Sequence, residues 1–158
     1  MPVQVAVCGP SHCTDEDKTN AYQVGRLLAR AGATVICGGG SGVMAAVAAG
    51  VRAENGLVIG IHPSDTTDDA NPDLSAVIVT NMGDARNAII VWSADAVIAV
   101  GGSWGTLSEI ALAKRRGGIP VIALGGWTLL DRDSNPLPDP VTSVGSPQQA
   151  VDLALASG

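Results

Sequence analysis

The chain has 158 residues and a formal net charge of −6, and hydrophobic residues make up 46% of it. This length predicts a single domain over residues 1–158, with a core of Ala, Val, Ile and Leu because the chain has no Phe and one Tyr. The nine Lys and Arg residues are scattered apart from Lys114–Arg116, so no broad basic surface is available to bind DNA or RNA. The chain also lacks a signal-peptide pattern and an apolar run of the roughly 18 residues that a membrane span needs. We therefore expect a cytoplasmic protein with no nucleic-acid or membrane partner.

The cysteines predict neither a disulfide framework nor a metal site. Cys8, Cys13 and Cys37 are odd in number and occur in a chain without an export signal, so a set of disulfides is not expected. Their spacing together with His12 fits no zinc-binding template. Cys8 and Cys37 end two apolar runs, which predicts that both are buried at the ends of strands.

Strands and helices alternate through the first half of the sequence. Short apolar runs predict four strands, at residues 3–8, 34–37, 57–61 and 76–79. The first helix is expected to begin near Thr14, which caps it together with Asp17, and to end at Gly32. A second helix spans about residues 42–54, with Met44 facing the core, and a polar loop follows the third strand.

The second half continues the alternation. Asp84 is expected to cap a helix that carries Arg86 and Asn87 in its first turn. There follow a strand at 96–100, a helix at 106–116, a strand at 120–124, a Pro-rich loop and a last helix capped by Ser146. Strands made of continuous Val, Ile and Ala predict a mostly parallel sheet with helices on both faces. The predicted fold class is therefore α/β and Rossmann-like.

Two glycine-rich loops open helices directly after apolar strands. Gly38–Gly42 follows the strand at 34–37, and Gly101–Gly105 follows the strand at 96–100. The first amides of a helix are unpaired donors at the positive end of its dipole, and glycines let a ligand approach the backbone, so each loop can hold a phosphate. In parallel sheets such loops meet at the carboxyl ends of the strands. We expect one crevice that binds an anionic group.

Three motifs, in this order along the chain, resemble one known group of proteins. The stretches Gly38–Met44, Ala85–Asn87 and Gly105–Glu109 together resemble the Lonely Guy superfamily, long labelled lysine decarboxylase-like. The resemblance runs from Val5 to about Leu124 and implies a Rossmann-like fold, in agreement with the periodicity.

Departures from the cytokinin-activating members of that superfamily indicate a particular branch. Those phosphoribohydrolases carry a Pro-Gly-Gly-x-Gly-Thr-x-x-Glu loop and an Arg-Lys pair, whereas this chain has Gly101 for the Pro, Ser103 for the second Gly and Asn87 for the Lys. The motifs Gly-Gly-x-Trp-Gly-Thr-Leu-Ser-Glu and Ala-Arg-Asn resemble the molybdenum cofactor carrier branch instead. The resemblance implies a carrier of a phosphate-containing, nucleotide-like or molybdopterin-type ligand. It also implies a homo-oligomer, either a dimer or a tetramer, that requires no cofactor of its own.

An enzymatic alternative uses the same residues. In a nucleoside 5′-monophosphate phosphoribohydrolase, Glu109 would stabilise an oxocarbenium-like transition state or activate water, and Arg86 would hold the phosphate or ribose. Structural roles compete with both assignments. Glu109 could close a capping box begun by Thr106, and Arg86 could form an ion pair with Asp84 or Asp95.

The candidate ligand-binding residues come from four segments of the chain. Among them Trp104 could stack on a planar ring or pack between subunits. The full expected set is Gly9, Ser11, Gly39, Gly40, Ser41, Gly42, Arg86, Asn87, Gly102, Ser103, Trp104, Gly105, Thr106 and Glu109.

Overall fold

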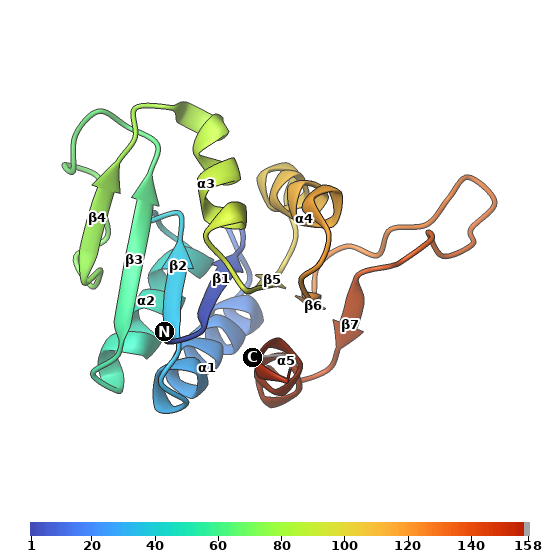
Figure 1. Ribbon diagram of the computed structural model, residues 1–158, viewed down its shortest axis with the longest axis horizontal. Coiled ribbons are helices and arrows are strands. Elements are labelled where there is room, and N and C mark those ends of the chain that lie inside the picture. Colours follow the sequence, from blue (N-terminus) through green and yellow to red (C-terminus); the bar gives the residue numbers. More distant parts are fainter. Residues whose placement is uncertain (157–158) are drawn as a thin grey trace.

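The computed structural model describes residues 1–156 and contains a seven-stranded sheet whose strands are all parallel (Figure 1). The strand order is β4-β3-β2-β1-β5-β6-β7, so the chain order reverses between β1 and β5. The strands are β1 (Gln4–Cys8), β2 (Thr34–Cys37), β3 (Leu57–His62), β4 (Ala76–Val79), β5 (Ala96–Val100), β6 (Val121–Leu124) and β7 (Thr142–Val144). The predicted Rossmann-like α/β fold is confirmed, and its sheet is entirely parallel.

Helices cover both faces of the sheet, as expected. They are α1 (Asp15–Arg30), α2 (Val43–Ala53), α3 (Arg86–Trp92), α4 (Trp104–Arg116) and α5 (Pro147–Leu155). Helices α1, α2 and α5 pack on one face, and α3 and α4 pack on the other. Within residues 1–156, no helix combines the length and the apolar character that crossing a membrane requires.

Alternate residues of the central strands enter two separate cores. In β1, Val5 and Val7 face α1, α2 and α5, whereas Ala6 and Cys8 face α3 and α4. Cys8 and Cys37 are buried at strand ends, as predicted, and they lie in different cores on opposite faces of the sheet. This position separates the two thiols, so they do not pair.

Local capping chemistry fixes where several helices begin. The Thr14 hydroxyl accepts a hydrogen bond from the Asp17 amide at 3.0 Å, and the Asp17 carboxylate accepts one from the Thr14 amide at 3.4 Å, which confirms the predicted capping box of α1. Ser146 caps α5 by accepting from the Gln149 amide at 3.2 Å. The Gln149 side chain bonds to the amide of Gly145 rather than to that of Ser146.

Three local predictions are wrong. Asp84 does not cap α3, because residues Gly83–Ala85 form a short 3-10 helix that runs directly into α3. Met44 is partly exposed rather than part of the core. The strand β7 falls in the stretch expected to be loop, since its sequence is short and polar and it lies at the edge of the sheet.

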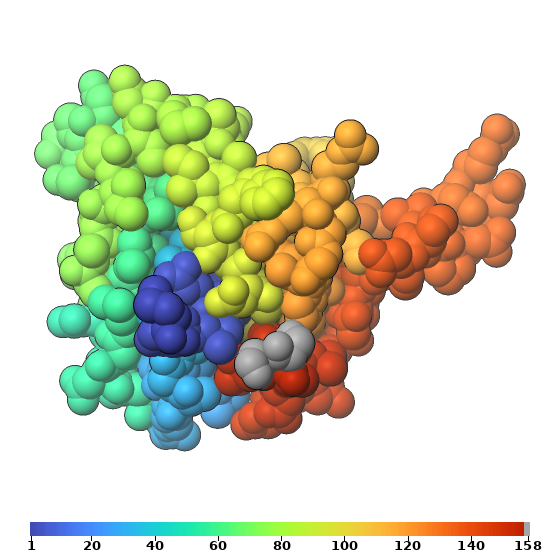
Figure 2. Space-filling model, viewed as in Figure 1, coloured from blue at the N-terminus to red at the C-terminus, as the bar shows by residue number. Residues whose placement is uncertain are grey.

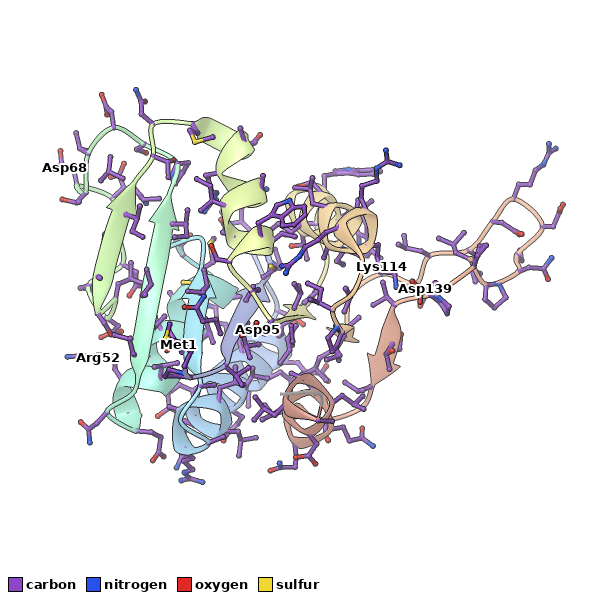
Figure 3. The ribbon with its side chains drawn as sticks, in the orientation of Figure 1. Met1, Arg52, Asp68, Asp95, Lys114 and Asp139 are labelled. Atoms are coloured by element: carbon purple, nitrogen blue, oxygen red, sulfur yellow. The ribbon has the colours of Figure 1, made fainter. Side chains whose placement is uncertain are left out.

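Residues 126–141 form an arm that stands out from the rest of the molecule (Figures 1 and 2). Leu130 and Pro136 pair through a single antiparallel bridge within it. An ion pair of 2.8 Å between Lys114 of α4 and Asp139 ties the arm to the body (Figure 3). The Pro-rich stretch is therefore an extension of the fold, held at its base.

Candidate functional site

The candidate site lies where the chain order reverses in the middle of the sheet. The neighbouring parallel strands β1 and β5 are followed by Gly9 and Gly101. The loop Gly38–Gly42 joins them from β2, and the Val43 amide donates a hydrogen bond to the Pro10 carbonyl at 3.1 Å. Ligands bind α/β sheets at such switch points. The structure thus brings the loops after β1, β2 and β5 together at one edge.

Two adjoining cavities open at this edge. The smaller, here called the inner pocket, has a volume of about 110 Å³. It is lined by Cys8, Gly9, Pro10, Ser11, Gly38, Met44, Asp84, Arg86, Asn87, Ser103, Gly105, Thr106 and Glu109. The larger, here called the outer groove, has a volume of about 720 Å³. It is lined by Pro10, Ser11, His12, Cys13, Thr14, Asp17, Lys18, Ser41, Gly42 and Gly102, so that Pro10 and Ser11 belong to both cavities.

Glu109 of α4 supplies a buried carboxyl group to the inner pocket, where it is 9% exposed. Burial raises the pKa of Glu109, and hydrogen bonding with Cys8 and the positive charge of Arg86 act in the opposite direction. The predicted capping box with Thr106 is wrong, because α4 begins at Trp104 and its cap is Ser103. Helix capping therefore does not account for Glu109.

Arg86 is held in place by main-chain oxygens at the ends of two strands. Its Nη1 donates hydrogen bonds to the carbonyls of Gly38 at 2.7 Å and Ile61 at 2.8 Å. The alternative ion pairs are absent within the described chain, where Asp95 instead accepts from the Gln4 amide at 2.9 Å. The Nε of Arg86 is buried and has no hydrogen-bond partner among residues 1–156.

Asn87 lies next to Arg86 in α3 and is 5% exposed. Its Nδ2 donates to the Ser108 hydroxyl at 3.2 Å, which links α3 to α4. Its Oδ1 is buried and accepts no hydrogen bond from the part of the chain that the structure describes. Buried polar atoms are almost always paired with protein or water, so this acceptor is an exception among the side chains around the inner pocket.

The glycine loops contribute fewer unpaired amides than the sequence predicts. The Ser103 hydroxyl accepts from the Thr106 amide at 3.1 Å and lies 2.9 Å from the Thr106 hydroxyl. At the start of α2, the Val43 amide already donates to Pro10. Each helix therefore has one of its first amides paired within the protein.

Most of the predicted site residues line the two cavities. The inner pocket contains Gly9, Ser11, Arg86, Asn87, Ser103, Gly105, Thr106 and Glu109. The outer groove contains Ser11, Ser41, Gly42 and Gly102.

Three predicted residues line neither cavity: Gly39, Gly40 and Trp104. A Cβ at Gly39 would lie against Gly60 and the side chain of Leu74, neither of which lines the two cavities. Trp104 is 78% exposed, and its ring meets that of Trp127 edge to face, with centroids 5.1 Å apart. A direct ligand contact of these three residues stays a prediction.

Several lining residues were not predicted from the sequence. In the inner pocket these are Cys8, Pro10, Gly38, Met44 and Asp84. In the outer groove they are His12, Cys13, Thr14, Asp17 and Lys18. The signal that could have found the second group is the position of residues 10–18 directly after β1, because this strand borders the switch point.

The thiols of the site are not activated for nucleophilic chemistry. Burial raises the pKa of Cys8 in the inner pocket well above its usual range, and it also raises the pKa of Cys13 in the outer groove. Both therefore remain protonated at neutral pH. Cys37 lines neither cavity, and burial raises its pKa to about 11. Within residues 1–156, no three His, Cys, Asp or Glu side chains are grouped so that they could hold a metal ion.

An all-parallel sheet with two cavities at its switch point defines an α/β protein of the Rossmann-like class, a class in which ligands bind at such points. The chain belongs to the SLOG cluster4 family, whose model matches residues 2–151. An uncharacterised protein of Archaeoglobus fulgidus is 46% identical to it over 115 residues, which make up 73% of this chain and 76% of that protein.

Solved structures support a closer placement within the superfamily. The molybdenum cofactor binding protein from the phototrophic bacterium Rippkaea orientalis is 38% identical, with a TM-score of 0.90 over 99% of this chain and 98% of that one. The molybdenum cofactor carrier protein from Chlamydomonas reinhardtii is 27% identical, with a TM-score of 0.80 over 99% of each chain. The resemblance to the Lonely Guy superfamily and its molybdenum cofactor carrier branch is thereby confirmed.

Proposed function

We propose that this protein is a binding or carrier protein for a phosphate-containing, nucleotide-like or molybdopterin-type ligand. The observation that carries the proposal is the pair of adjoining cavities at the switch point, one buried and polar, the other open. Binding sites for small organic ligands have volumes of about 300–1,000 Å³, and the outer groove falls within this range. The inner pocket would take one functional group of the same ligand.

The phosphate belongs in the outer groove. Ser41 and Gly42 line it at the start of α2, Gly102 lines it just before α4, and Lys18 brings a positive charge. Helix N-termini favour anions through their free amides and their dipole. Ligand binding of this kind also agrees with the cofactor-binding proteins that this chain resembles.

Calorimetric titration with adenosine monophosphate and with a molybdopterin preparation tests the proposal. We expect binding of at least one of them, with weaker affinity in a Lys18→Gln variant because the positive charge is lost. Arg52→Gln is a matched control, since it removes a charge from α2 without lining either cavity. Equal affinity in the wild type and Lys18→Gln, or no binding of either compound, would contradict the proposal.

A phosphoribohydrolase is the second candidate, favoured by one observation. Glu109 and Arg86, the pair that such an enzyme would use to stabilise the oxocarbenium-like transition state and to hold the phosphate or ribose, both line the inner pocket. Incubation with adenosine monophosphate and its N6-substituted analogues, followed by assay of the free base, separates the two functions. We expect no turnover, and release of base that Glu109→Ala abolishes would replace the carrier by the enzyme.

We also expect a cytoplasmic homo-oligomer, a dimer or tetramer, that does not bind nucleic acid. Large apolar side chains are exposed on and beside α3 and α4, including Trp92 at 67%, Trp104 at 78% and Leu112 at 38%. Contact between subunits would remove this surface from water, with a favourable free energy of about 25 cal/mol per Å². Light scattering of the purified protein measures the mass, and a mass of 15.8 kDa would contradict the expectation.

A further inference from the structure

We propose that the outer groove recognises the ring of its ligand through Asp17, whose carboxylate accepts hydrogen bonds from a ring edge with two adjacent donors. An amino group beside a ring N–H, as in guanine and in pterins, has this chemistry. The inference rests on the proposed function and adds a residue that decides which ring the protein prefers. The phosphate of the same ligand would occupy the opposite end of the groove.

The outer groove carries charges of opposite sign on neighbouring residues. Its lining within residues 1–156 includes one cation, Lys18, and one anion, Asp17, both from the beginning of α1. Consecutive residues of a helix point about 100° apart. The two side chains therefore face different neighbours of α1.

Lys18 lies on the side of α1 that packs against α2. It precedes Tyr22 by one helical turn, and the Tyr22 backbone is so close to Gly50 of α2 that a Cβ on Gly50 would collide with it. Residues one turn apart share a face of the helix. Gly42, the N-terminal cap of α2, also lines the groove. This end therefore combines a cation with the positive end of a helix dipole, which favours phosphate.

Asp17 lies against the loops that follow β5 and β6. A Cβ built on Gly101, after β5, would be 2.7 Å from Asp17 Oδ2. One built on Gly125, after β6, would be 3.6 Å from Asp17 Oδ1. The carboxylate therefore belongs to the end of the groove lined by Gly102. Because like charges repel, a phosphate is disfavoured at this end.

The Asp17 carboxylate has acceptor capacity that the protein does not use. Within residues 1–156 it forms no ion pair, and the hydrogen bond that it accepts from the Thr14 amide is long, at 3.4 Å. An ionised carboxylate has about four acceptor sites. Asp17 is only partly buried, and its oxygens are not among the unpaired atoms that are cut off from solvent. Donors of a ligand in the groove can therefore reach it.

The edge of a ring fits this carboxylate better than the ribose of a nucleotide does. Two parallel N–H donors match the two carboxylate oxygens and form a forked, charge-assisted pair. The ribose hydroxyls lie close to the phosphate, whereas the edge of the base is the far end of the molecule. Since Lys18 and Asp17 lie on different faces of α1, a ligand whose phosphate is near Lys18 would bring its ring to Asp17.

Calorimetric titrations with guanosine, inosine and adenosine monophosphates test the inference. The three nucleotides share their phosphate and ribose and differ in the ring. Guanine has an amino group beside the ring N–H, hypoxanthine has the N–H alone, and adenine has an acceptor in its place. We expect guanosine monophosphate to bind about tenfold more tightly than inosine monophosphate, because the latter lacks one hydrogen bond to a charged group. Adenosine monophosphate should bind most weakly.

Three variants separate the role of Asp17 from general effects of charge. Asp17→Asn should abolish the preference for guanosine over inosine monophosphate, and it keeps an oxygen that can accept from the Thr14 amide. Asp15→Asn is the matched control, since it removes the same charge from the same turn without lining either cavity, and it should keep the preference. Lys18→Gln should weaken all three nucleotides alike and leave their ratio unchanged.

Equal affinity of the wild type for guanosine and inosine monophosphates, or a preference that persists in Asp17→Asn, would overturn the inference and leave the carrier proposal standing. Binding of guanosine monophosphate that requires Mg²⁺ would also overturn it, because the carboxylate would then hold a cation.

If no nucleotide binds, molybdopterin replaces the nucleotides as the probe. Asp17→Asn should then bind it about tenfold more weakly than the wild type and Asp15→Asn do. Equal affinity in the three proteins would overturn the inference alone. A wild type that binds none of the four compounds would overturn both proposals.

Discussion

At the scale of single residues, the environment of Glu109 has a consequence for stability. Burial disfavours its charged form, so the pKa of Glu109 is raised in the folded protein relative to about 4.3 in the unfolded chain. Below the pKa of the unfolded chain, the carboxyl group is protonated in both the folded and the unfolded state. Its ionisation then does not change the free energy of unfolding. As pH rises through the folded pKa, the free energy of unfolding decreases, because the native state must bury a charge.

Glu109→Gln should therefore be more stable than the wild type at pH 8, and the difference should shrink as the pH falls to 4. Melting temperatures of both proteins across this range measure the effect. The same stability difference at both ends of the range would show that Glu109 is not electrostatically strained by its burial.

Ser103 provides a second test at this scale, since the structure makes it the cap of α4 in place of Thr106. Ser103→Ala should lower the free energy of unfolding by about 1 kcal/mol, as loss of a cap does. Ser103→Asn should recover most of this loss, because Asn also caps well. Denaturant unfolding of the three proteins compares them, and an unchanged stability in Ser103→Ala would place the cap elsewhere.

The sequence predicted which residue types gather at the site better than it predicted what each one does. Glu109 and Arg86 were expected there because of the motifs that carry them, and both line the inner pocket. The carbonyl partners of Arg86 could not be predicted, since Gly38 and Ile61 come from strand ends distant in sequence. The unpaired Oδ1 of Asn87 likewise depends on how α3 packs against α4.

At the scale of elements, the loop that opens α2 is fitted tightly to the loop that follows β1. Gly42 has a φ of 66°, and a Cβ at this position would collide with the carbonyl oxygens of Pro10 and Ser11. A residue other than glycine would therefore be strained twice, by its backbone conformation and by the neighbouring loop. Gly42 thus holds together the two loops that form the outer groove.

Gly42→Ala should lower the free energy of unfolding by more than the roughly 1–2 kcal/mol that a left-handed backbone alone costs an alanine. Gly32→Ala is the matched control, because Gly32 has a φ of 78° but open space around its Cβ position. Denaturant unfolding should give Gly42→Ala a lower free energy of unfolding than Gly32→Ala. Only Gly42→Ala should also weaken the binding of adenosine monophosphate. Equal losses of stability would mean that the two loops are not tightly packed.

The elements themselves were largely predictable from periodicity, with one informative exception. The central strands are continuous apolar runs because both of their faces are buried, and they were placed within a residue or two. The edge strand β7 has the sequence Thr-Ser-Val and no apolar run to mark it. Its strand conformation depends on pairing with β6, which a local pattern does not contain.

At the scale of the whole molecule, strand order decides where ligands can bind. Because the chain order reverses between β1 and β5, the loops after β1, β2 and β5 lie side by side at the carboxyl edge. The arm of residues 126–141 begins beside the last of these loops, where Gly126 lies against Gly101 and Trp127 against Gly102, and its tip extends away from the body (Figures 1 and 2). The central claim is therefore that a phosphate-bearing ligand occupies the edge formed by these three loops.

Titration of the ¹⁵N-labelled protein with adenosine monophosphate, followed by amide chemical shifts, tests this claim most directly. We expect the largest shifts in residues 9–11, 38–42 and 101–105, with all of them saturating together, and no response in residues 131–138 of the arm, beyond its contact with Gly101 and Gly102. Shifts concentrated in the arm or along β4, with those three loops unchanged, would contradict it.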